Sequence, residues 1–128
     1  MNVKHILLID DNEVDNYVSS YLIKKSKIAE KITVQKSAMA ALEFLEQIKD
    51  NVLEFPELIL LDLKMPNMDG FAFLEKFAVF PAVKVDNCDV YMLSFSDDPL
   101  DIKKAMDFSV VKKFLTKPFR IEMLKELV

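Results

Sequence analysis

The sequence predicts an α/β fold: a doubly wound, five-stranded parallel sheet covered by helices on both faces. Two observations support this prediction. Short apolar runs alternate five times with longer segments whose apolar residues recur at helical spacing. One of these runs, residues 58–61, is apolar at every position, as in a strand buried on both faces of a parallel sheet. Strands that alternate with helices are joined by right-handed crossovers, so all their carboxyl ends lie at one edge of the sheet.

The length and composition fit one ordinary globular domain, residues 1–128. A net charge of −4 argues against nucleic acid as a direct partner, since phosphate binding requires a basic surface. No apolar run approaches the roughly 20 residues of a membrane span, and the N-terminus lacks a signal-peptide pattern. We therefore expect a cytoplasmic protein without membrane contact. The single cysteine, Cys88, excludes an internal disulfide and is interpreted as a structural thiol.

The first two strand-and-helix units occupy the N-terminal third of the chain. The apolar run 5–9 predicts a strand that ends in Asp10 and Asp11. The next segment predicts a helix whose apolar stripe lies on the sheet: Val14, Tyr17, Val18, Tyr21 and Leu22. Residues 32–36 alternate between apolar and polar, which predicts a half-buried edge strand. Ser37 is expected to cap a second helix, whose inner face carries Ala38, Ala41, Leu42, Leu45 and Ile48.

The central strand ends at Asp62 and is followed by a turn that contains the only glycine of the chain, Gly70. A helix is predicted from about residue 70 to residue 80. Its aromatic side chains are interpreted mainly as core residues, with a partner surface as the alternative: Phe71, Phe73, Phe77 and Phe80. Residues 81–88 are predicted to form a loop.

The last two units complete the alternation. Residues 90–93 predict the fourth strand, which ends in Ser94. Residues 97–99, Asp-Asp-Pro, predict a helix start, with proline in the first turn. Its inner stripe is expected to contain Ile102, Ala105 and Met106. Residues 113–116 predict the fifth strand, which Lys117 and a proline terminate. A final amphipathic helix is predicted to run to the end of the chain, with Ile121, Leu124 and Val128 facing inward.

The predicted strand ends bring a reactive set of side chains to one edge: Asp10, Asp11, Asp62, Ser94 and Lys117. Two like charges about 4 Å apart cost on the order of 4 kcal/mol at an effective dielectric constant near 20. A hard cation such as Mg²⁺, which binds carboxylates and keeps waters for a substrate phosphate, would offset this repulsion together with the lysine. The set therefore indicates phosphoryl transfer with Asp62 as the nucleophile, and the hydroxyl and ammonium groups as partners of the phosphoryl oxygens.

These residues belong to motifs that give the chain its resemblance to a known family. The motifs are Ile9-Asp10-Asp11-Asn12, Leu61-Asp62-Leu63-Lys64-Met65-Pro66 through Met68-Asp69-Gly70, Leu93-Ser94, and Phe114-Leu115-Thr116-Lys117-Pro118. The motifs span the whole chain in the usual order. Through them, the chain resembles the chemotaxis-regulator-like receiver (REC) domain of bacterial two-component response regulators. The resemblance implies the flavodoxin-like strand order 2-1-3-4-5.

The resemblance also implies a role for each matched residue. Asp62 resembles the phosphoacceptor, Ser94 the switch hydroxyl, Phe114 the aromatic switch residue and Lys117 the phosphate-pairing lysine. The implied metal is Mg²⁺ or Mn²⁺, with Asp10, Asp11, Asp62 and the backbone carbonyl of Lys64 around it. A cis bond is implied between Lys117 and Pro118.

The function implied by the resemblance is a phosphoaspartate signalling switch. The phosphoryl donor would be a sensor histidine kinase or a histidine phosphotransfer protein. The protein would catalyse only its own phosphorylation and dephosphorylation, and so would not be an enzyme in the usual sense. Phosphorylation would change the surface of the fourth predicted helix, the fifth strand and the last helix, for a downstream protein target or for an output domain missing from this sequence. We expect a monomer, or a weak dimer on phosphorylation.

Two residues depart from the pattern usual in this family. Phe95, after Ser94, is bulkier than the usual residue, and Lys64 places a second cation two residues after Asp62. We hypothesise that both side chains hinder an attacking water and lengthen the lifetime of the phosphoaspartate. Ser109, in place of the frequent glycine, affects only a turn.

Two other functions stay open at this point. One is a receiver-like docking module that is not phosphorylated in practice. The other is a phosphohydrolase of the dehalogenase-like type, although that class requires an aspartate where Lys64 stands. A calcium-binding EF-hand in residues 11–22 is excluded, since Asn16 replaces the required glycine and Leu22 the final glutamate. The single histidine, His5, is interpreted as a packed or solvated side chain rather than as a phosphate relay.

Overall fold

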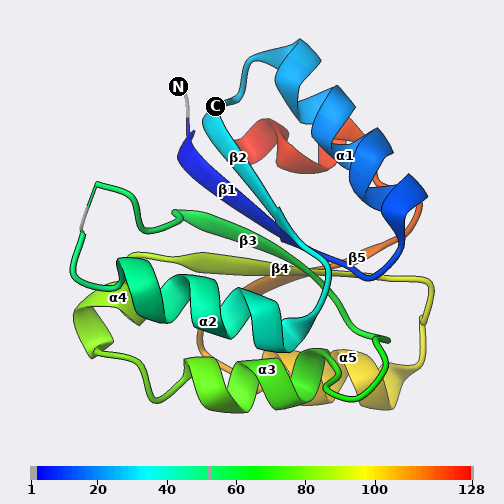
Figure 1. The fold of residues 1–128 in the computed structure, drawn as a ribbon. Coiled ribbons are helices and arrows are strands. Elements are labelled where there is room, and N and C mark those ends of the chain that lie inside the picture. Colours follow the sequence, from blue (N-terminus) through cyan, green and yellow to red (C-terminus); the bar gives the residue numbers. More distant parts are fainter. Residues whose placement is uncertain (1–2, 52, 128) are drawn as a thin grey trace.

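The computed structural model describes residues 3–51 and 53–127 of the protein. It confirms the predicted fold class: five parallel strands in the order β2-β1-β3-β4-β5 form one doubly wound sheet (Figure 1). The strands are β1 (Val3–Ile9), β2 (Ala29–Gln35), β3 (Leu58–Asp62), β4 (Asp89–Ser94) and β5 (Val111–Thr116). Within the described residues, no helix has the length and apolar character needed to cross a membrane.

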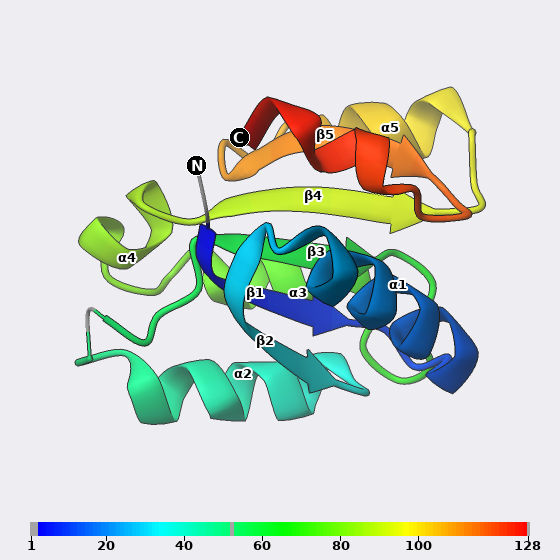
Figure 2. The ribbon, with the colours of Figure 1, turned by 90° about the horizontal axis from the view of Figure 1, so that it is seen from above.

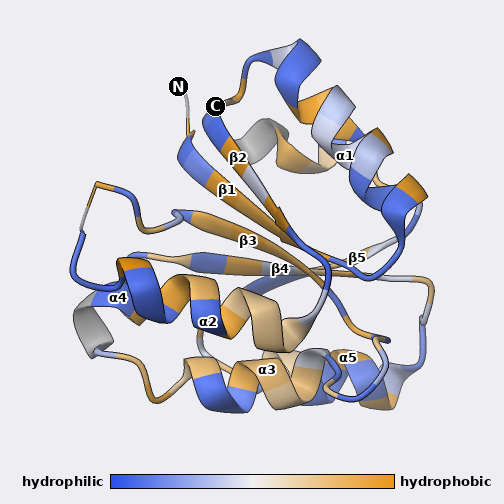
Figure 3. Cartoon of the chain, in the orientation of Figure 1, coloured by the Kyte–Doolittle hydropathy of each residue, from blue (hydrophilic) through white to orange (hydrophobic). Residues whose placement is uncertain are grey.

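Helices cover both faces of the sheet. One face carries α1 (Glu13–Ser26) and the final 3₁₀ helix η1 (Ile121–Leu127); the other carries α2 (Ala38–Ile48), α3 (Gly70–Phe77) and α5 (Pro99–Met106) (Figures 1 and 2). The strands alternate between two cores: Leu7 and Ile59 belong to the core under α2 and α3, whereas Ile6 and Leu60 belong to the core under α1. Figure 3 shows the hydrophobic residues along β3, which is buried at every position.

The apolar stripe predicted for the first helix is wrong. Val14, Tyr17, Val18 and Tyr21 are between 43% and 73% exposed, and only Leu22 packs against the core. The buried residues of α1 are instead Asn16, Ser19 and Ile23. The side chain of Asn16 donates a hydrogen bond to the backbone carbonyl of Asp10 at 2.8 Å, which fixes the rotation of the helix against the end of β1.

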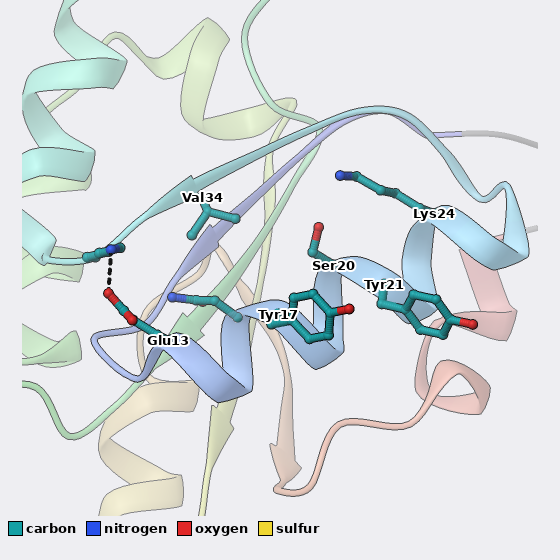
Figure 4. Close-up of a pocket in the computed structure, with 8 residues that line it drawn as sticks. Glu13, Tyr17, Ser20, Tyr21, Lys24 and Val34 are labelled. Atoms are coloured by element: carbon teal, nitrogen blue, oxygen red, sulfur yellow. Dashed lines mark hydrogen bonds and ion pairs between the residues drawn. The ribbon is translucent and has the colours of Figure 1, made fainter.

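The exposed tyrosines border an open groove of about 410 Å³ between α1 and β2. Tyr17 and Tyr21 extend from the helix along this groove, and an ion pair between Glu13 and Lys36 at 2.7 Å joins helix and strand (Figure 4). None of the site residues predicted from the sequence lines the groove.

On the opposite face, α2 follows the prediction. The hydroxyl of Ser37 accepts a hydrogen bond from the backbone N–H of Ala40 at 3.0 Å and caps the helix. The predicted inner residues are buried or packed against the core: Ala38, Ala41, Leu42, Leu45 and Ile48. The phenylalanines of α3 are also core residues as predicted, with Phe80 partly buried beyond the end of the helix at Phe77.

Several predicted boundaries need correction. The segment 81–88, predicted as a loop, contains the short helix α4 (Ala82–Asp86) after Pro81, because proline suits the start of a helix and one turn is too short for a periodic pattern. Strand β2 begins at Ala29 rather than at residue 32, and β5 begins at Val111 rather than at residue 113.

The C-terminal third confirms most predictions about its helices. Asp98 caps α5, with Pro99 in the first turn, and Ala105 is buried, but Met106 is 43% exposed and not part of the inner stripe as predicted. The last helix is a 3₁₀ helix that buries Leu124, with Ile121 partly buried. The predicted inward position of Val128 lies outside the described residues.

Candidate functional site

Three carboxylates meet at the carboxyl edge of the sheet, as predicted. Asp10 and Asp11 follow β1, and Asp62 is the last residue of β3, which pairs with β1 through Ile9 and Leu61. Oxygen atoms of the three carboxylates lie within 4.8 Å of one another. Asp10 and Asp62 are buried, whereas Asp11 is exposed. Oxygen donors grouped at this spacing fit a hard divalent cation that also keeps a side open to solvent.

Lys117 enters the same cluster from the end of β5. Its Nζ lies 2.9 Å from Asp10 Oδ2, 2.9 Å from Asp15 Oδ2 and 3.4 Å from Asp62 Oδ1. Burial alone would lower the pKa of Lys117, but the hydrogen bonds to Asp10 and Asp15 outweigh burial and raise it above its ordinary value. The peptide bond between Lys117 and Pro118 is cis, as the resemblance implied. The lysine is therefore a permanent cation at the base of the site.

Asp15 is a site residue that the sequence analysis missed. It lies in the first turn of α1, where its backbone N–H donates to the capping side chain of Asn12 at 2.9 Å. A residue three positions after a helix cap points back toward the start of the helix. Since α1 begins at the edge of the sheet, that spacing from Asn12 was the available signal, and the apolar pattern of the helix obscured it.

The electrostatics of the cluster favour a cation beside Asp62. Burial, and then the negative charge of Asp10, raise the pKa of Asp62 to about 7, while Lys117 acts in the opposite direction. One lysine therefore does not compensate the grouped carboxylates. A divalent cation would lower this pKa again and keep the Asp62 carboxylate ionised, which is the form that can act as a nucleophile.

The loop after Asp62 folds back tightly against its own strand. Gly70 donates its backbone N–H to the carbonyl of Leu63 at 2.9 Å. A Cβ atom at Gly70 would lie 2.9 Å from the carbonyl oxygen of Asp62 and 3.0 Å from Leu63 Cα, so only glycine fits without displacing the backbone that carries Asp62. Asn67 takes the left-handed conformation in this loop, with φ of 69°.

A cleft of about 190 Å³ opens above the carboxylates. It is lined by Asp10, Asp11, Asn12, Asp15, Asp62, Lys64, Ser94, Phe95 and Lys117. Ser94 is buried at the end of β4, where its hydroxyl accepts a hydrogen bond from the backbone N–H of Ser96 at 3.0 Å. Phe95 is 71% exposed, and its ring centre lies 5.4 Å from the ammonium of Lys117.

Lys64 and Phe114 complete the predicted set. The Lys64 side chain is turned toward α5, with Nζ 3.7 Å from Asp101 Oδ2. Asp101 also accepts a hydrogen bond from the hydroxyl of Ser96 at 2.9 Å, so α5 is tied to the loop after Ser94. Phe114 is opposite Met92 in the pairing of β4 with β5, is half-buried, and packs against the core under α2 and α3.

The fold and the site together define a class: doubly wound α/β proteins with carboxylates, a hydroxyl and a lysine at the strand ends, suited to metal-assisted phosphoryl chemistry. A family model, the response regulator receiver domain, matches residues 6–128. The chain belongs to this family.

Individual relatives agree with the family match. The two-component response regulator ORR8 of rice (Oryza sativa) is 30% identical over 121 residues, which cover 94% of this chain and 92% of the relative. A two-component response regulator from Cytophaga hutchinsonii has a TM-score of 0.91 at 27% identity, with 99% of this chain and 95% of that chain covered. The Mn²⁺-bound form of response regulator Rcp1 has a TM-score of 0.75 at 29% identity, with coverage of 97% and 88%.

Family membership establishes the broad function. Receiver domains of two-component systems carry phosphoaspartate signals, interact with histidine kinases or phosphotransfer proteins, and bind a divalent metal at an acidic pocket. The expected bacterial origin is not singled out, because the similar proteins include plant regulators from rice and Arabidopsis thaliana as well as the Cytophaga protein.

Proposed function

We propose that the protein is a phosphoaspartate switch in which Asp62 accepts a phosphoryl group from a sensor histidine kinase or a histidine phosphotransfer protein. One observation carries the proposal: Asp62 lies in an open cleft between two further carboxylates and a lysine whose Nζ is 3.4 Å from its Oδ1. In the transfer, an Asp62 oxygen would form the bond to phosphorus while the bond from phosphorus to the donor histidine nitrogen breaks.

The remaining site residues have distinct roles in this proposal. Asp10, Asp11, Asp62 and the backbone carbonyl of Lys64 would hold Mg²⁺, with Mn²⁺ as a substitute; the Mn²⁺-bound form of the similar Rcp1 supports this choice. When bound, the metal supplies positive charge beside the phosphoryl oxygens. Lys117 would pair with one of these oxygens and Ser94 would donate its hydroxyl to another. The protein would catalyse only its own phosphorylation and dephosphorylation.

The output is proposed to be a change of the surface formed by α5, β5 and η1. Movement of Ser94 toward the phosphoryl group would leave space for Phe114, which is half-buried beside β4. The contact from Ser96 to Asp101 would carry the loop movement to α5. Moving such an equilibrium from 1:99 to 99:1 takes roughly 5.5 kcal/mol, and each hydrogen bond to a charged group contributes about 1.5–3 kcal/mol.

We also propose a location, an oligomeric state and an output partner for this switch. Residues 1–128 would act as one receiver domain in the cytoplasm, as a monomer or a weak dimer on phosphorylation. The altered surface would serve a downstream protein target or an output domain outside this sequence. No direct contact with nucleic acid or a membrane is part of the proposal.

Acetyl phosphate with Mg²⁺ tests the central step. Intact-mass measurement should show the gain of one phosphoryl group, which is lost when Mg²⁺ is chelated and absent in Asp62→Asn. Asp50→Asn is the matched control, since Asp50 is exposed at the end of α2. Transfer to a residue other than Asp62 would contradict the proposal.

A docking module that is not phosphorylated is the second candidate, favoured by the bulky Phe95 ring beside Lys117. Titration with beryllofluoride in the presence of Mg²⁺ distinguishes the two functions. A switch should bind this phosphoryl analogue, and the NMR signals of residues in α5 and β5 should shift. An inert module should show no shift.

A further inference from the structure

Asp15 has no role in the function proposed above, yet it makes one of the two shortest side-chain contacts of Lys117. An ammonium group has three N–H donors. Around Lys117, three carboxylates stand within 3.4 Å of Nζ: Asp10, Asp15 and Asp62. Its side chain is only 6% exposed, so water has little access to it. A phosphoryl group on Asp62 therefore meets a lysine whose donors are already engaged.

Asp15 is the carboxylate that can release Lys117 most easily. Asp10 is held in place by its backbone and by a second contact, from the backbone N–H of Asn12 to its Oδ1 at 2.9 Å. Asp62 is the phosphoryl acceptor itself. The side chain of Asp15 is 32% exposed, in the first turn of α1, so water can solvate its carboxylate once the contact with Lys117 breaks.

Asp15 also changes the charge balance of the cleft. With this residue, four carboxylates surround Lys117 in the cleft, while the second lysine of the cleft, Lys64, is paired with Asp101 of α5. A bound divalent cation then still leaves one excess negative charge beside Lys117. An incoming phosphoryl group is itself anionic. The excess charge opposes the anion, while it favours the metal.

We propose that Asp15 is an inhibitory positioning residue that holds Lys117 in the resting state and opposes its pairing with the phosphoryl group. This inference rests on the proposed function. Asp15 strengthens the binding of the divalent cation and weakens the binding of phosphoryl-like anions, so it sets how readily the switch turns on.

The test measures two affinities in Asp15→Asn, which keeps the shape of the side chain and removes its charge. Calorimetry gives the Kd of Mg²⁺ alone and the Kd of beryllofluoride at saturating Mg²⁺. We expect beryllofluoride to bind roughly three- to tenfold more tightly and Mg²⁺ to bind more weakly by a similar factor, as for a charge interaction partly screened by water. Asp107→Asn, an exposed aspartate on the far end of α5, should leave both affinities unchanged.

The two affinities are expected to change in opposite directions, which separates this inference from a structural role. A disturbed α1 would weaken the binding of both Mg²⁺ and beryllofluoride. Asp15→Glu keeps the charge and should resemble the wild type, and Asp15→Ser provides a second neutral variant if the asparagine variant does not fold. Weaker or unchanged beryllofluoride binding in the neutral variants would overturn the role of Asp15 while leaving the proposed function intact. A wild-type protein that does not bind beryllofluoride with Mg²⁺ would instead overturn the proposed function.

Discussion

The helices α1 and α2 lie on opposite faces of the sheet and both carry an apolar stripe, but only α2 buries it. In α2 the buried residues are Ala38, Ala41 and Leu45. In α1 the stripe that contains Tyr17 and Tyr21 is exposed, and a polar residue, Asn16, is buried instead. The two helices therefore obey different constraints: burial of apolar area alone orients α2, whereas in α1 hydrogen bonds at the functional edge act together with one fully buried apolar residue, Ile23.

The cause of the difference is the distance from the carboxylate cluster. Helix α1 begins at Glu13, two residues after Asp11, and its cap and first turn contribute Asn12, Asp15 and Asn16 to contacts around Asp10 and Lys117. An unsatisfied buried polar group costs about 1–3 kcal/mol, which is comparable to the gain from burying one large apolar side chain, about 1.5–3 kcal/mol. Several polar contacts at one end of α1 can thus outweigh its apolar stripe.

Truncation of one side chain in each helix tests this contrast most directly. Leu45→Ala in α2 should lower the free energy of unfolding by about 2–5 kcal/mol, because it removes a fully buried side chain. Tyr17→Ala in α1 should change it by about 0.5 kcal/mol or less, since its side chain is 73% exposed. Urea denaturation measures both. Equal losses in the two variants would show that the α1 stripe is packed in solution.

A second variant removes the hydrogen bond that joins α1 to the end of β1. Asn16→Ala removes the hydrogen bond to the Asp10 carbonyl and leaves that buried acceptor unpaired, so the free energy of unfolding should fall by about 1–3 kcal/mol. Because Asp10 belongs to the carboxylate cluster, Mg²⁺ affinity measured by calorimetry should fall as well. Ser20→Ala, one turn further along α1, is the control and should leave Mg²⁺ affinity unchanged. A stable Asn16→Ala protein with normal Mg²⁺ affinity would refute the anchoring role.

These contrasts explain which parts of the fold were predictable. Strands 58–61 and 90–93 were predictable because continuous apolar runs between turn residues permit few other structures. The cap at Ser37 was predictable from a local rule. The burial of Asn16 was not, since it depends on a carbonyl that reaches the helix only in the folded protein. The short helix at 82–86 was missed because a single turn carries no periodicity.

The candidate site also contains residues that the sequence could predict and residues that it could not. Parallel topology alone brings Asp11 and Asp62 together, so their convergence followed from the strand assignment. Asp15 was missed because its role depends on where the first turn of α1 meets Lys117, a contact between residues 102 positions apart. The roles assigned to Ser94 and Phe114 came from the family resemblance and stay predictions.

A titratable group behind α2 yields a pH-dependent prediction. Nδ1 of His5 lies 2.6 Å from the carbonyl of Glu54, which can only accept, so Nδ1 carries the proton and Nε2 accepts from the hydroxyl of Thr33 at 2.8 Å. This buried contact confirms His5 as a packed residue. Burial lowers its pKa below the ordinary value, although the hydrogen bond to Glu54 acts in the opposite direction.

The sign follows from proton uptake. The unfolded chain protonates His5 near its ordinary pKa of about 6.5, whereas the folded protein resists protonation, so the unfolded state binds more protons below that pH. The free energy of unfolding should therefore decrease as the pH falls from 7 to 5. Denaturant titrations at several pH values should show a shallower decrease in His5→Gln. An identical pH dependence in the two proteins would show that other groups cause it.

The last prediction compares the two lysines of the cleft, which pair with carboxylates from helices on opposite faces of the sheet. Asp15 of α1 holds the buried Lys117, whereas Asp101 of α5 holds the exposed Lys64 at 3.7 Å. An exposed ion pair of this kind contributes about 0–1 kcal/mol, so Lys64→Asn should leave the free energy of unfolding nearly unchanged.

Because Asp101 draws Lys64 toward α5 while the Phe95 ring stays beside Lys117, Phe95 should protect the phosphoaspartate more than Lys64 does. Phosphoaspartate decay, followed by intact mass, should be faster in Phe95→Ala than in Lys64→Asn and fastest in the double variant. A double variant that loses phosphate no faster than the wild type would refute the protection by these side chains.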